Sequence, residues 1–390
     1  MYKRQDTAIA VGIDEAKVRV TPMEIGGGFG GKFPLYHEPV AALLSKKSGK
    51  AVKIVMSRQE VLEGTGPTPG SYSKVKIGIT NEGKITAGQA YIAFEAGAYP
   101  GSPVAAGAQC VFAAYDVPNG LVDGLDVVVN KPKAAAYRAP GATQVAMATE
   151  TVIDELAEKI GMDPIEIRMI NAAKEGTRRI DGPVYPLIGC EEVLKEMKKH
   201  PHYNAPITNK NVGRGVAIGF WFNAGLHSSA TISVNSDGTV NLVEGSPDIG
   251  GSRASLSMMA AEVLGINPEE VNATVTNTDQ IGYTFGTGGS RVTFATGWAV
   301  YEAAQDAKKQ MIARAAKIWD VDASTLELKD GNFQSKTDLF NNGGASTSTM
   351  LNQELQTQWS DFGNTSKLSN KIATDVLLGY DLIQEGIDTS

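Results

Sequence analysis

Cysteine and histidine are scarce in this chain, with two cysteines and four histidines among 390 residues. Cys110 and Cys190 lie far apart and form no Cys-x-x-Cys pair. An iron–sulfur cluster needs about four thiolates, so this chain alone cannot hold one. The two cysteines provide no disulfide framework, which favours a reducing cytoplasm. The histidines lack the His-x3-His spacing of a zinc site.

Long apolar runs and an excess of basic residues are missing too. No stretch reaches the ~18 apolar residues of a membrane span, and no apolar region follows residues 1–6 as in a signal peptide. The net charge is −7, which argues against nucleic acid as a partner. Any site for an anion must therefore be built locally.

Glycine is abundant, and many of the 43 glycines lie in loops. Four such loops precede predicted helices, and each carries one basic residue: 26–32 with Lys32, 137–141 with Arg138, 248–253 with Arg253, and 286–291 with Arg291. Glycine lets backbone N–H groups approach a ligand, and helix N-termini and arginine favour anions. The set predicts a large polyanionic cofactor held at several points. The alternative is four tight turns with solvated basic residues.

Hydrophobic periodicity predicts mixed helices and strands in two parts of the chain. Strands are expected at 17–21, 51–56, 73–93 (with a turn at 81–83), 217–243 and 271–276. Helices are expected at 39–46, 145–160, 164–174, 254–264 and 297–318. Residues 178–212 contain four prolines and little periodicity, which indicates a connector.

The loops also indicate an internal repeat. A strand, an acidic-Ile-Gly-Gly segment, a helix and a strand follow one another around residues 24–27 and again around 248–251. Duplication of an α+β unit would produce this pattern.

The first loop matches G-x-G-x-x-G through Gly26, Gly28 and Gly31, which is typical of NAD- or FAD-binding dehydrogenases. Two further glycines depart from that fingerprint. Where its acidic residue is expected, ~20 residues on, this chain has Lys46 and Lys47. A dinucleotide-binding dehydrogenase using Gly26–Gly31 remains an alternative.

Four motifs occur in one order: GGGFGGK at 26–32, AYRAPGATQ at 136–144, ETVIDELAEKIGMDPIEIR at 150–168, and GTGGSR at 286–291. Together they resemble the large subunits of molybdenum hydroxylases, the xanthine dehydrogenase and aldehyde oxidase family, over residues 8–335. That family binds molybdenum through the dithiolene of a pterin, often as the cytosine dinucleotide, with few protein ligands. The resemblance accounts for a metalloenzyme without a His/Cys cluster.

The resemblance implies an α+β fold of two related cofactor-binding domains, each a mixed sheet with packed helices. The expected boundaries are 1–185 for the first domain, 186–212 for the connector and 213–338 for the second domain. Residues 339–390 form a polar tail unlike the family. The tail and the first five residues are expected not to belong to the parent enzyme.

The resemblance also implies the site residues. Phe29 and Gly30 match the pair beside the molybdenum ligands, and Arg138 matches an arginine that approaches the same place. The other cofactor-binding residues expected are Gly28, Gly31, Gly250, Gly251, Ser252, Gly288, Gly289 and Ser290. The family commonly has Gly-Gln-Gly at 250–252, so one pterin hydrogen bond is missing here.

Other departures concern substrate and catalysis. Purine-oxidising members have an acidic residue where this chain has Phe33, and a stacking phenylalanine where it has Pro140, so the usual purine binding is not expected. The family's catalytic glutamate lies in a Gly-Glu motif. This chain has no Gly-Glu pair, and near its C-terminal end it has Glu385-Gly386 in reversed order, so we expect no catalytic residue here and no activity from the chain alone.

The resemblance implies a cytoplasmic oxidoreductase that hydroxylates an aldehyde or N-heterocycle with oxygen from water. Electrons would pass to [2Fe-2S] and FAD subunits of a hetero-oligomer. A non-catalytic cofactor-binding protein is a further alternative. On the predicted helices, Glu150, Asp154 and Glu155 are interpreted as a solvated face, and residues 220–222 as a core strand.

Overall fold

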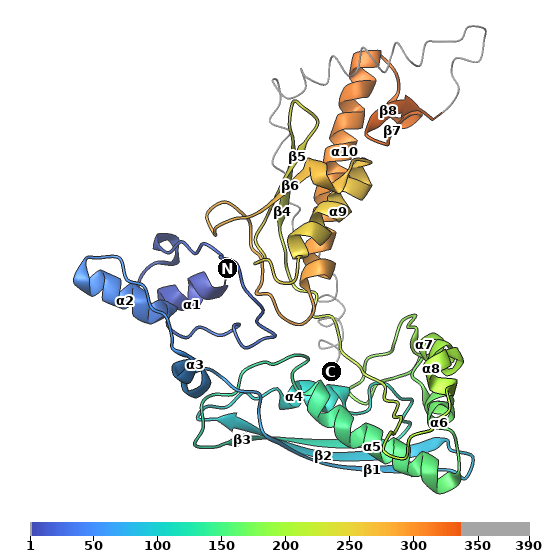
Figure 1. Cartoon of the computed structure of the whole chain (residues 1–390). Helices are drawn as coiled ribbons and strands as arrows, with labels where there is room; N and C mark the ends of the chain where they lie inside the picture. Colours follow the sequence, from blue (N-terminus) through green and yellow to red (C-terminus); the bar gives the residue numbers. More distant parts are fainter. Residues whose placement is uncertain (1, 337–390) are drawn as a thin grey trace, which may run out of the picture. The chain divides into compact units, whose positions relative to one another are not determined.

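The computed structural model describes residues 2–336, which fall into two compact units (Figure 1). The central unit comprises residues 29–34 and 55–222, and the C-terminal unit comprises 2–28, 35–54 and 223–336. The chain passes between the units several times. The expected contiguous segments, 1–185 and 213–338, therefore differ from the compact units, because the N-terminal residues pack with the C-terminal ones.

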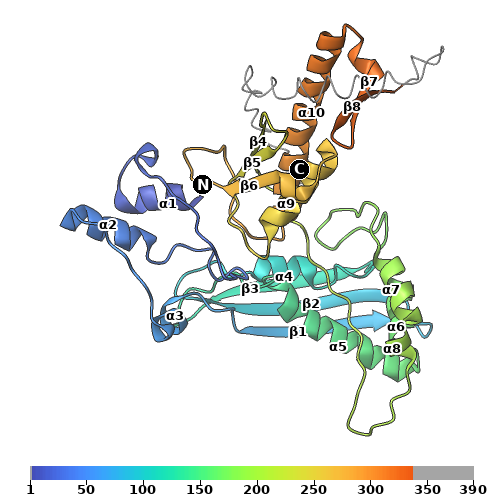
Figure 2. The same ribbon diagram turned by 45° about the horizontal axis from the view of Figure 1, so that its top comes forward.

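A three-stranded mixed sheet forms the base of the central unit. Strands β1 (Ser71–Ile79) and β2 (Ile85–Gly97) are antiparallel, and β3 (Gly120–Val128) runs parallel to β2. Along β2, Ala90, Ile92 and Phe94 are buried and their neighbours largely exposed, so one face of the sheet forms the core. Helices α4 (Val104–Cys110) and α5 (Ala142–Ile160) cover that face (Figure 2). The predicted hairpin is confirmed.

The helices of the central unit begin and end at typical capping residues. Helix α5 ends at Gly161, which adopts φ 67° and donates its N–H to the helix. Helix α6 (Pro164–Asn171) begins after Asp163, whose carboxylate accepts from two N–H groups of the first turn. It stops at Asn171, earlier than predicted, because the Asn171 side chain bonds the β1–β2 turn and Ile85.

Helices also occupy the predicted connector, namely α7 (Cys190–Lys199) and α8 (Pro201–Asn204). The expectation of an irregular connector is wrong here, because α7 carries apolar residues at positions 190, 193, 194 and 197, the spacing of one helix face, and buries Leu194. Residues 217–222, the start of the strand region predicted at 217–243, form no strand, although 220–222 do pack on the core of the unit. Helix α3 (Arg58–Gly64) also belongs to this unit.

The C-terminal unit repeats the same plan. Strands β4 (Ala230–Val234) and β5 (Val240–Glu244) are antiparallel, and β6 (Val271–Val275) runs parallel to β5. Helices α9 (Ser252–Leu264) and α10 (Gly297–Trp319) pack against this sheet (Figure 1). A π-helical turn, Val292–Thr296, precedes α10, and the hairpin β7 (Leu326–Lys329) and β8 (Asn332–Ser335) follows it. Helices α1 (Tyr2–Val11) and α2 (Glu38–Ser48) complete the unit.

The repeat lies elsewhere than the loops indicated. It relates β1-β2-α4-β3-α5 to β4-β5-α9-β6-α10, each a hairpin, a crossover helix, a parallel strand and a long helix. The predicted strands at 17–21 and 51–56 are wrong, because neither segment has a partner strand. Val20 instead exchanges hydrogen bonds with Thr278 in a loop. No helix among residues 2–336 is long and apolar enough to span a bilayer.

Candidate cofactor-binding loops

In the central unit, residues 29–30 pack on residues 136–138, far away in the sequence. The Arg138 N–H donates to the Phe29 carbonyl oxygen at 2.7 Å. Gly30 has φ 100°, and a Cβ there would lie 2.4 Å from the Ala136 carbonyl oxygen, so only glycine allows this approach. The Phe29 ring is 62% exposed and lies 6.5 Å from the Tyr137 ring. The structure thus places Phe29, Gly30 and Arg138 together.

The backbone of these two segments is strained. Phe29, Arg138 and Ala139 have φ values of 51°, 36° and 55°, in a region that costs about 1–3 kcal/mol each for residues other than glycine. Gly141, at φ 87°, begins α5 and packs against residues 103 and 107. The Arg138 guanidinium is exposed and makes no hydrogen bond or ion pair within residues 2–336. Strain of this kind concentrates at ligand sites.

In the C-terminal unit, Gly250 and Gly251 lead into α9 with φ values of 70° and 85°. A Cβ on either residue would meet no atom within 4 Å, so their backbone faces open space. Ser252, which follows, is buried at the start of the helix. Unpaired N–H groups of a helix N-terminus beside bare backbone suit an anionic or acceptor-rich ligand.

Arg253 is not free to bind that ligand. Its guanidinium donates to Asp248 and to Glu24, each at 2.8 Å. Although burial works against it, bonding by Arg253 and Ser252 keeps the pKa of Asp248 below its usual value. Arg253 is therefore neither free in solvent nor available to bind phosphate, the two roles expected from the sequence; it links the 248–253 loop to Glu24.

The 286–291 loop is fixed by the start of the C-terminal half. Gly289 has φ 75°, and a Cβ there would lie 2.5 Å from the Cβ of Ala224. The Ala224 N–H donates to the Gly289 carbonyl oxygen at 2.9 Å, and the Asn223 amide donates to the Ser290 carbonyl oxygen at 2.7 Å. Gly288 precedes Gly289, which contacts Ala224, and follows Thr287. The Thr287 hydroxyl is buried and has no hydrogen-bond partner among the described residues.

Arg291 is the second basic residue with a structural role. It is 1% exposed and donates to the carbonyl oxygens of Gly225, His227 and Phe285 at 2.7–3.2 Å. Burial lowers its pKa to about 10. Of the four basic residues predicted to contact an anion, Arg253 and Arg291 thus form their bonds within the protein. Lys32 and Arg138 are exposed, with no side-chain partner in the described part of the chain.

A buried polar chain beneath these loops was missed from the sequence. Arg291 donates to Ser228, whose hydroxyl lies 2.8 Å from that of Thr296 in the π-helical turn. The Thr296 hydroxyl lies 3.0 Å from that of Ser246, whose N–H donates to Glu244 at 2.5 Å. These hydrogen bonds join the loops around residues 226, 246 and 290. Small hydroxyl residues at no regular spacing give no sequence signal.

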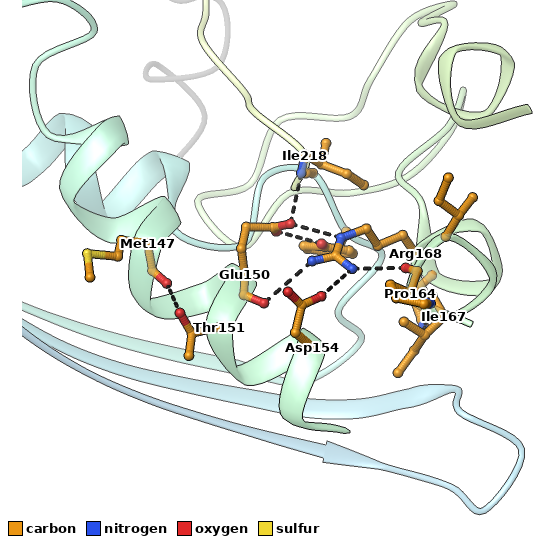
Figure 3. Close-up of polar contacts among 12 residues, drawn as sticks. Met147, Glu150, Thr151, Asp154, Pro164, Ile167, Arg168 and Ile218 are labelled. Atoms are coloured by element: carbon orange, nitrogen blue, oxygen red, sulfur yellow. Dashed lines mark hydrogen bonds and ion pairs between the residues drawn. The ribbon is translucent and has the colours of Figure 1, made fainter. Parts of the chain in front are cut away.

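A second buried network fixes helices in the central unit (Figure 3). The Glu150 carboxylate accepts from Arg168 Nε at 2.9 Å, the Ile218 N–H at 2.8 Å and the Tyr115 hydroxyl at 2.6 Å. Arg168 also pairs with Asp154 at 2.8 Å. The predicted solvated face is wrong for Glu150, because α6 packs on that side of α5; Glu155 is exposed as predicted.

The dinucleotide alternative fails on geometry. That fingerprint needs a glycine loop between a strand and a helix of a parallel βαβ unit. Residues 17–21 and 51–56, on either side of the loop and α2, form no strand. The loop 26–32 is therefore not part of such a unit.

The loops do fit an anionic pterin that supplies its own metal ligands. In the C-terminal unit, the open backbone at Gly250 and Gly251 and the orphaned Thr287 hydroxyl are available to acceptor atoms. In the central unit, the Arg138 guanidinium is available to them. Among residues 2–336, no three His, Cys, Asp or Glu side chains are grouped to bind a metal. Cys110 and Cys190 are free thiols.

Comparison with known proteins agrees with this fit. Two family models, both described as molybdopterin cofactor-binding domain, match residues 1–172 and 189–370. The xanthine dehydrogenase molybdenum-binding subunit of Escherichia coli O157:H7 is 30% identical over 83% of this chain and 46% of its own length. The aldehyde oxidoreductase molybdenum-binding subunit PaoC of Escherichia coli K12 is 33% identical over 69% of this chain and 38% of its own.

A solved structure shares the fold. Quinoline 2-oxidoreductase from Pseudomonas putida 86 superposes with a TM-score of 0.79 at 21% identity, over 96% of this chain and 50% of the other. The chain spans about half the length, or less, of the relatives it matches. The α+β fold of two related domains with mixed sheets is confirmed. With its two cofactor-binding domains, the chain belongs to the xanthine dehydrogenase and aldehyde oxidase family of molybdopterin-binding large subunits.

Proposed function

We propose that this chain is the cofactor-binding portion of an oxidoreductase that hydroxylates an aldehyde or an N-heterocycle with oxygen from water. Relatives named for xanthine and aldehyde oxidation support both substrate classes. Electrons would leave through iron–sulfur and FAD subunits, because this chain has too few thiolates for a cluster.

The observation that carries the proposal is the strained pair of segments around Phe29 and Arg138. Three residues other than glycine hold positive φ values to present one exposed ring and one unpaired guanidinium. Such strain persists only where the surrounding structure enforces it. We assign Phe29, Gly30 and Arg138, with Gly28 and Gly31, to the molybdenum end of the cofactor.

The C-terminal unit would hold the pterin. We assign backbone N–H groups of Gly250, Gly251 and Ser252 at the start of α9, and of the 288–290 segment, as its donors. Arg291 and Arg253 would not contact the pterin but would fix the loops that do. Arg291 bonds the carbonyl oxygens of residues 225 and 227, and Arg253 bonds Asp248. When bound, the molybdenum cofactor would supply the two-electron redox centre and a Lewis acid.

Substrate and cofactor form are narrower parts of the proposal. Phe33 and Pro140 replace the residues by which purine-oxidising members hold purines, so we propose a substrate other than a purine bound in that manner. We further propose the cytosine dinucleotide form of the cofactor. Backbone donors at two loops suit a ligand that extends beyond the pterin phosphate.

The test is co-expression of the chain with the iron–sulfur and FAD subunits of a relative. Molybdenum per chain is measured by mass spectrometry, and the nucleotide is identified after acid release. Molybdenum near one per chain, with cytidine monophosphate, is expected. A folded chain with neither would refute the proposal, and molybdenum with another nucleotide would correct only the cofactor form.

A further inference from the structure

Glu244, the last residue of β5, is a carboxylic acid buried inside the C-terminal unit. Its side chain is 0% exposed. Its cross-strand neighbours are Ala230 on β4 and Val275 on β6, both uncharged. The sheet therefore gives this carboxyl group no charged partner, although burying an ionised carboxylate without one is costly.

Hydrogen bonding compensates the charge only in part. One oxygen accepts the Ser246 N–H at 2.5 Å, and the other has no hydrogen-bond partner within the described residues. Thr296, next along the polar chain, is also uncharged. The ordinary ionised state of a glutamate is therefore poorly supported here.

Two charged groups near Glu244 lie on the loop above it and on α9. Asp248 disfavours the ionised form and Arg253 favours it, but Arg253 is already bonded to Asp248 and Glu24. Arg291 is linked to Glu244 indirectly, through the uncharged residues Ser228, Thr296 and Ser246 of the polar chain. Burial, the largest effect, raises the pKa of Glu244 to about 7.

The position of Glu244 links it to the cofactor loop. The loop that begins at Gly245 leads directly to Gly250 and Gly251, and its Ser246 is held by Glu244 through the N–H and by Thr296 through the hydroxyl. We propose that Glu244 is a proton-holding residue, which takes up a proton from solvent when the anionic molybdopterin binds the 248–252 loop. This inference rests on the proposed function.

The sign follows from electrostatics. A bound anion disfavours a second negative charge nearby, so it raises the pKa of Glu244 further. Below neutral pH, Glu244 is already protonated before the cofactor binds. Above neutral pH, Glu244 must take up a proton when the cofactor binds. If binding raises the pKa by about one unit, affinity falls about fivefold between pH 6 and pH 8 by proton linkage. No electron moves, and no covalent bond changes except to the proton.

The same proton affects folding. Because the folded pKa of Glu244 lies above the ordinary value of 4.5, the stability that the neutral group contributes is present at low pH and is lost as pH rises to about 7. This gives a readout that does not depend on activity or cofactor.

The experiment compares wild type, Glu244→Gln and the control Glu262→Gln. Glu262 is an exposed carboxylate near the end of α9, so its change removes a charge without touching the buried site. Half-saturating concentrations of molybdopterin are measured under anoxic conditions at pH 6, 7 and 8. Thermal unfolding without cofactor is followed from pH 4.5 to 8.

Wild type and E262Q are expected to lose about fivefold in affinity from pH 6 to pH 8 beyond any change in E244Q. The second ionisation of the cofactor phosphate, near pH 6, is common to all three. E244Q, which keeps an acceptor for Ser246, should bind as wild type does at pH 6 and unfold with less pH dependence. Equal pH slopes in wild type and E244Q would overturn the inference while leaving the proposed function intact. A folded wild type that binds no molybdopterin at any pH would refute both.

Discussion

Removing Glu150 should destabilise the central unit far more than removing a neighbouring acid on the same helix. Glu150→Ala leaves the Arg168 Nε, the Tyr115 hydroxyl and the Ile218 N–H without their shared acceptor (Figure 3). Arg168 is fully buried, and breaking a buried pair from one side costs about 3–5 kcal/mol. Asp154→Ala removes a partner that is 45% exposed from the same arginine, which should cost at most about 1 kcal/mol.

The assay is urea unfolding of the three proteins, with amide exchange of the 216–222 segment as a local readout. Loss of the bond from Ile218 should expose that segment to exchange in E150A but not in D154A. A double-mutant cycle with Arg168→Met isolates the pair, and coupling above about 1 kcal/mol is expected. If E150A and D154A lost similar stability, or if the cycle were additive, the network would not stabilise the unit as inferred.

Two further predictions concern the loops, and a third concerns the activity of the isolated chain. Arg138→Ala should lower molybdenum occupancy of the co-expressed enzyme at unchanged thermal stability, since its guanidinium has no internal partner; Arg178→Ala, another exposed arginine of the same unit, is the control, and equal occupancy in both would contradict the assigned role. Gly289→Ala should destabilise the apo chain by about 1–3 kcal/mol through its φ and its contact with Ala224, whereas Gly250→Ala, facing open space, should cost only about 1 kcal/mol in stability and mainly reduce cofactor binding; a larger melting shift for G250A would reverse this assignment. The isolated chain should show no aldehyde turnover with artificial electron acceptors, because it contains no Gly-Glu motif, and any turnover above background would contradict this.

The elements that the sequence predicted well are those with strong local signals. Helix α5 combines an amphipathic face with a glycine stop, and α9 and α10 follow glycine loops. The β1–β2 hairpin has alternating residues around a turn at Gly83. Local periodicity and capping are properties of neighbouring residues, so they survive in any single sequence. The ordered motifs were likewise sufficient for the family.

The strands expected at 17–21 and 51–56 failed for a non-local reason. An alternating segment becomes a strand only if another strand offers its N–H and C=O groups, and none does so here. The reversed Glu385-Gly386 pair and the polar tail at 339–390, both singled out from the sequence, lie outside the residues that the structure describes. The interleaved units likewise arise from contacts between distant segments.

The sequence by itself determined the long helices, the hairpins, the glycine loops and the family, since each depends on residues close together in the chain. Only the tertiary structure decided which charged groups are available to a ligand. Arg291 and Arg138 both lie in glycine-bearing loop motifs, yet one is enclosed by backbone carbonyls and the other is exposed. Glu150 and Glu244 look like ordinary surface acids, yet both are buried. Burial and hydrogen-bond partners come from residues remote in sequence, and they set the charge and the role of each group.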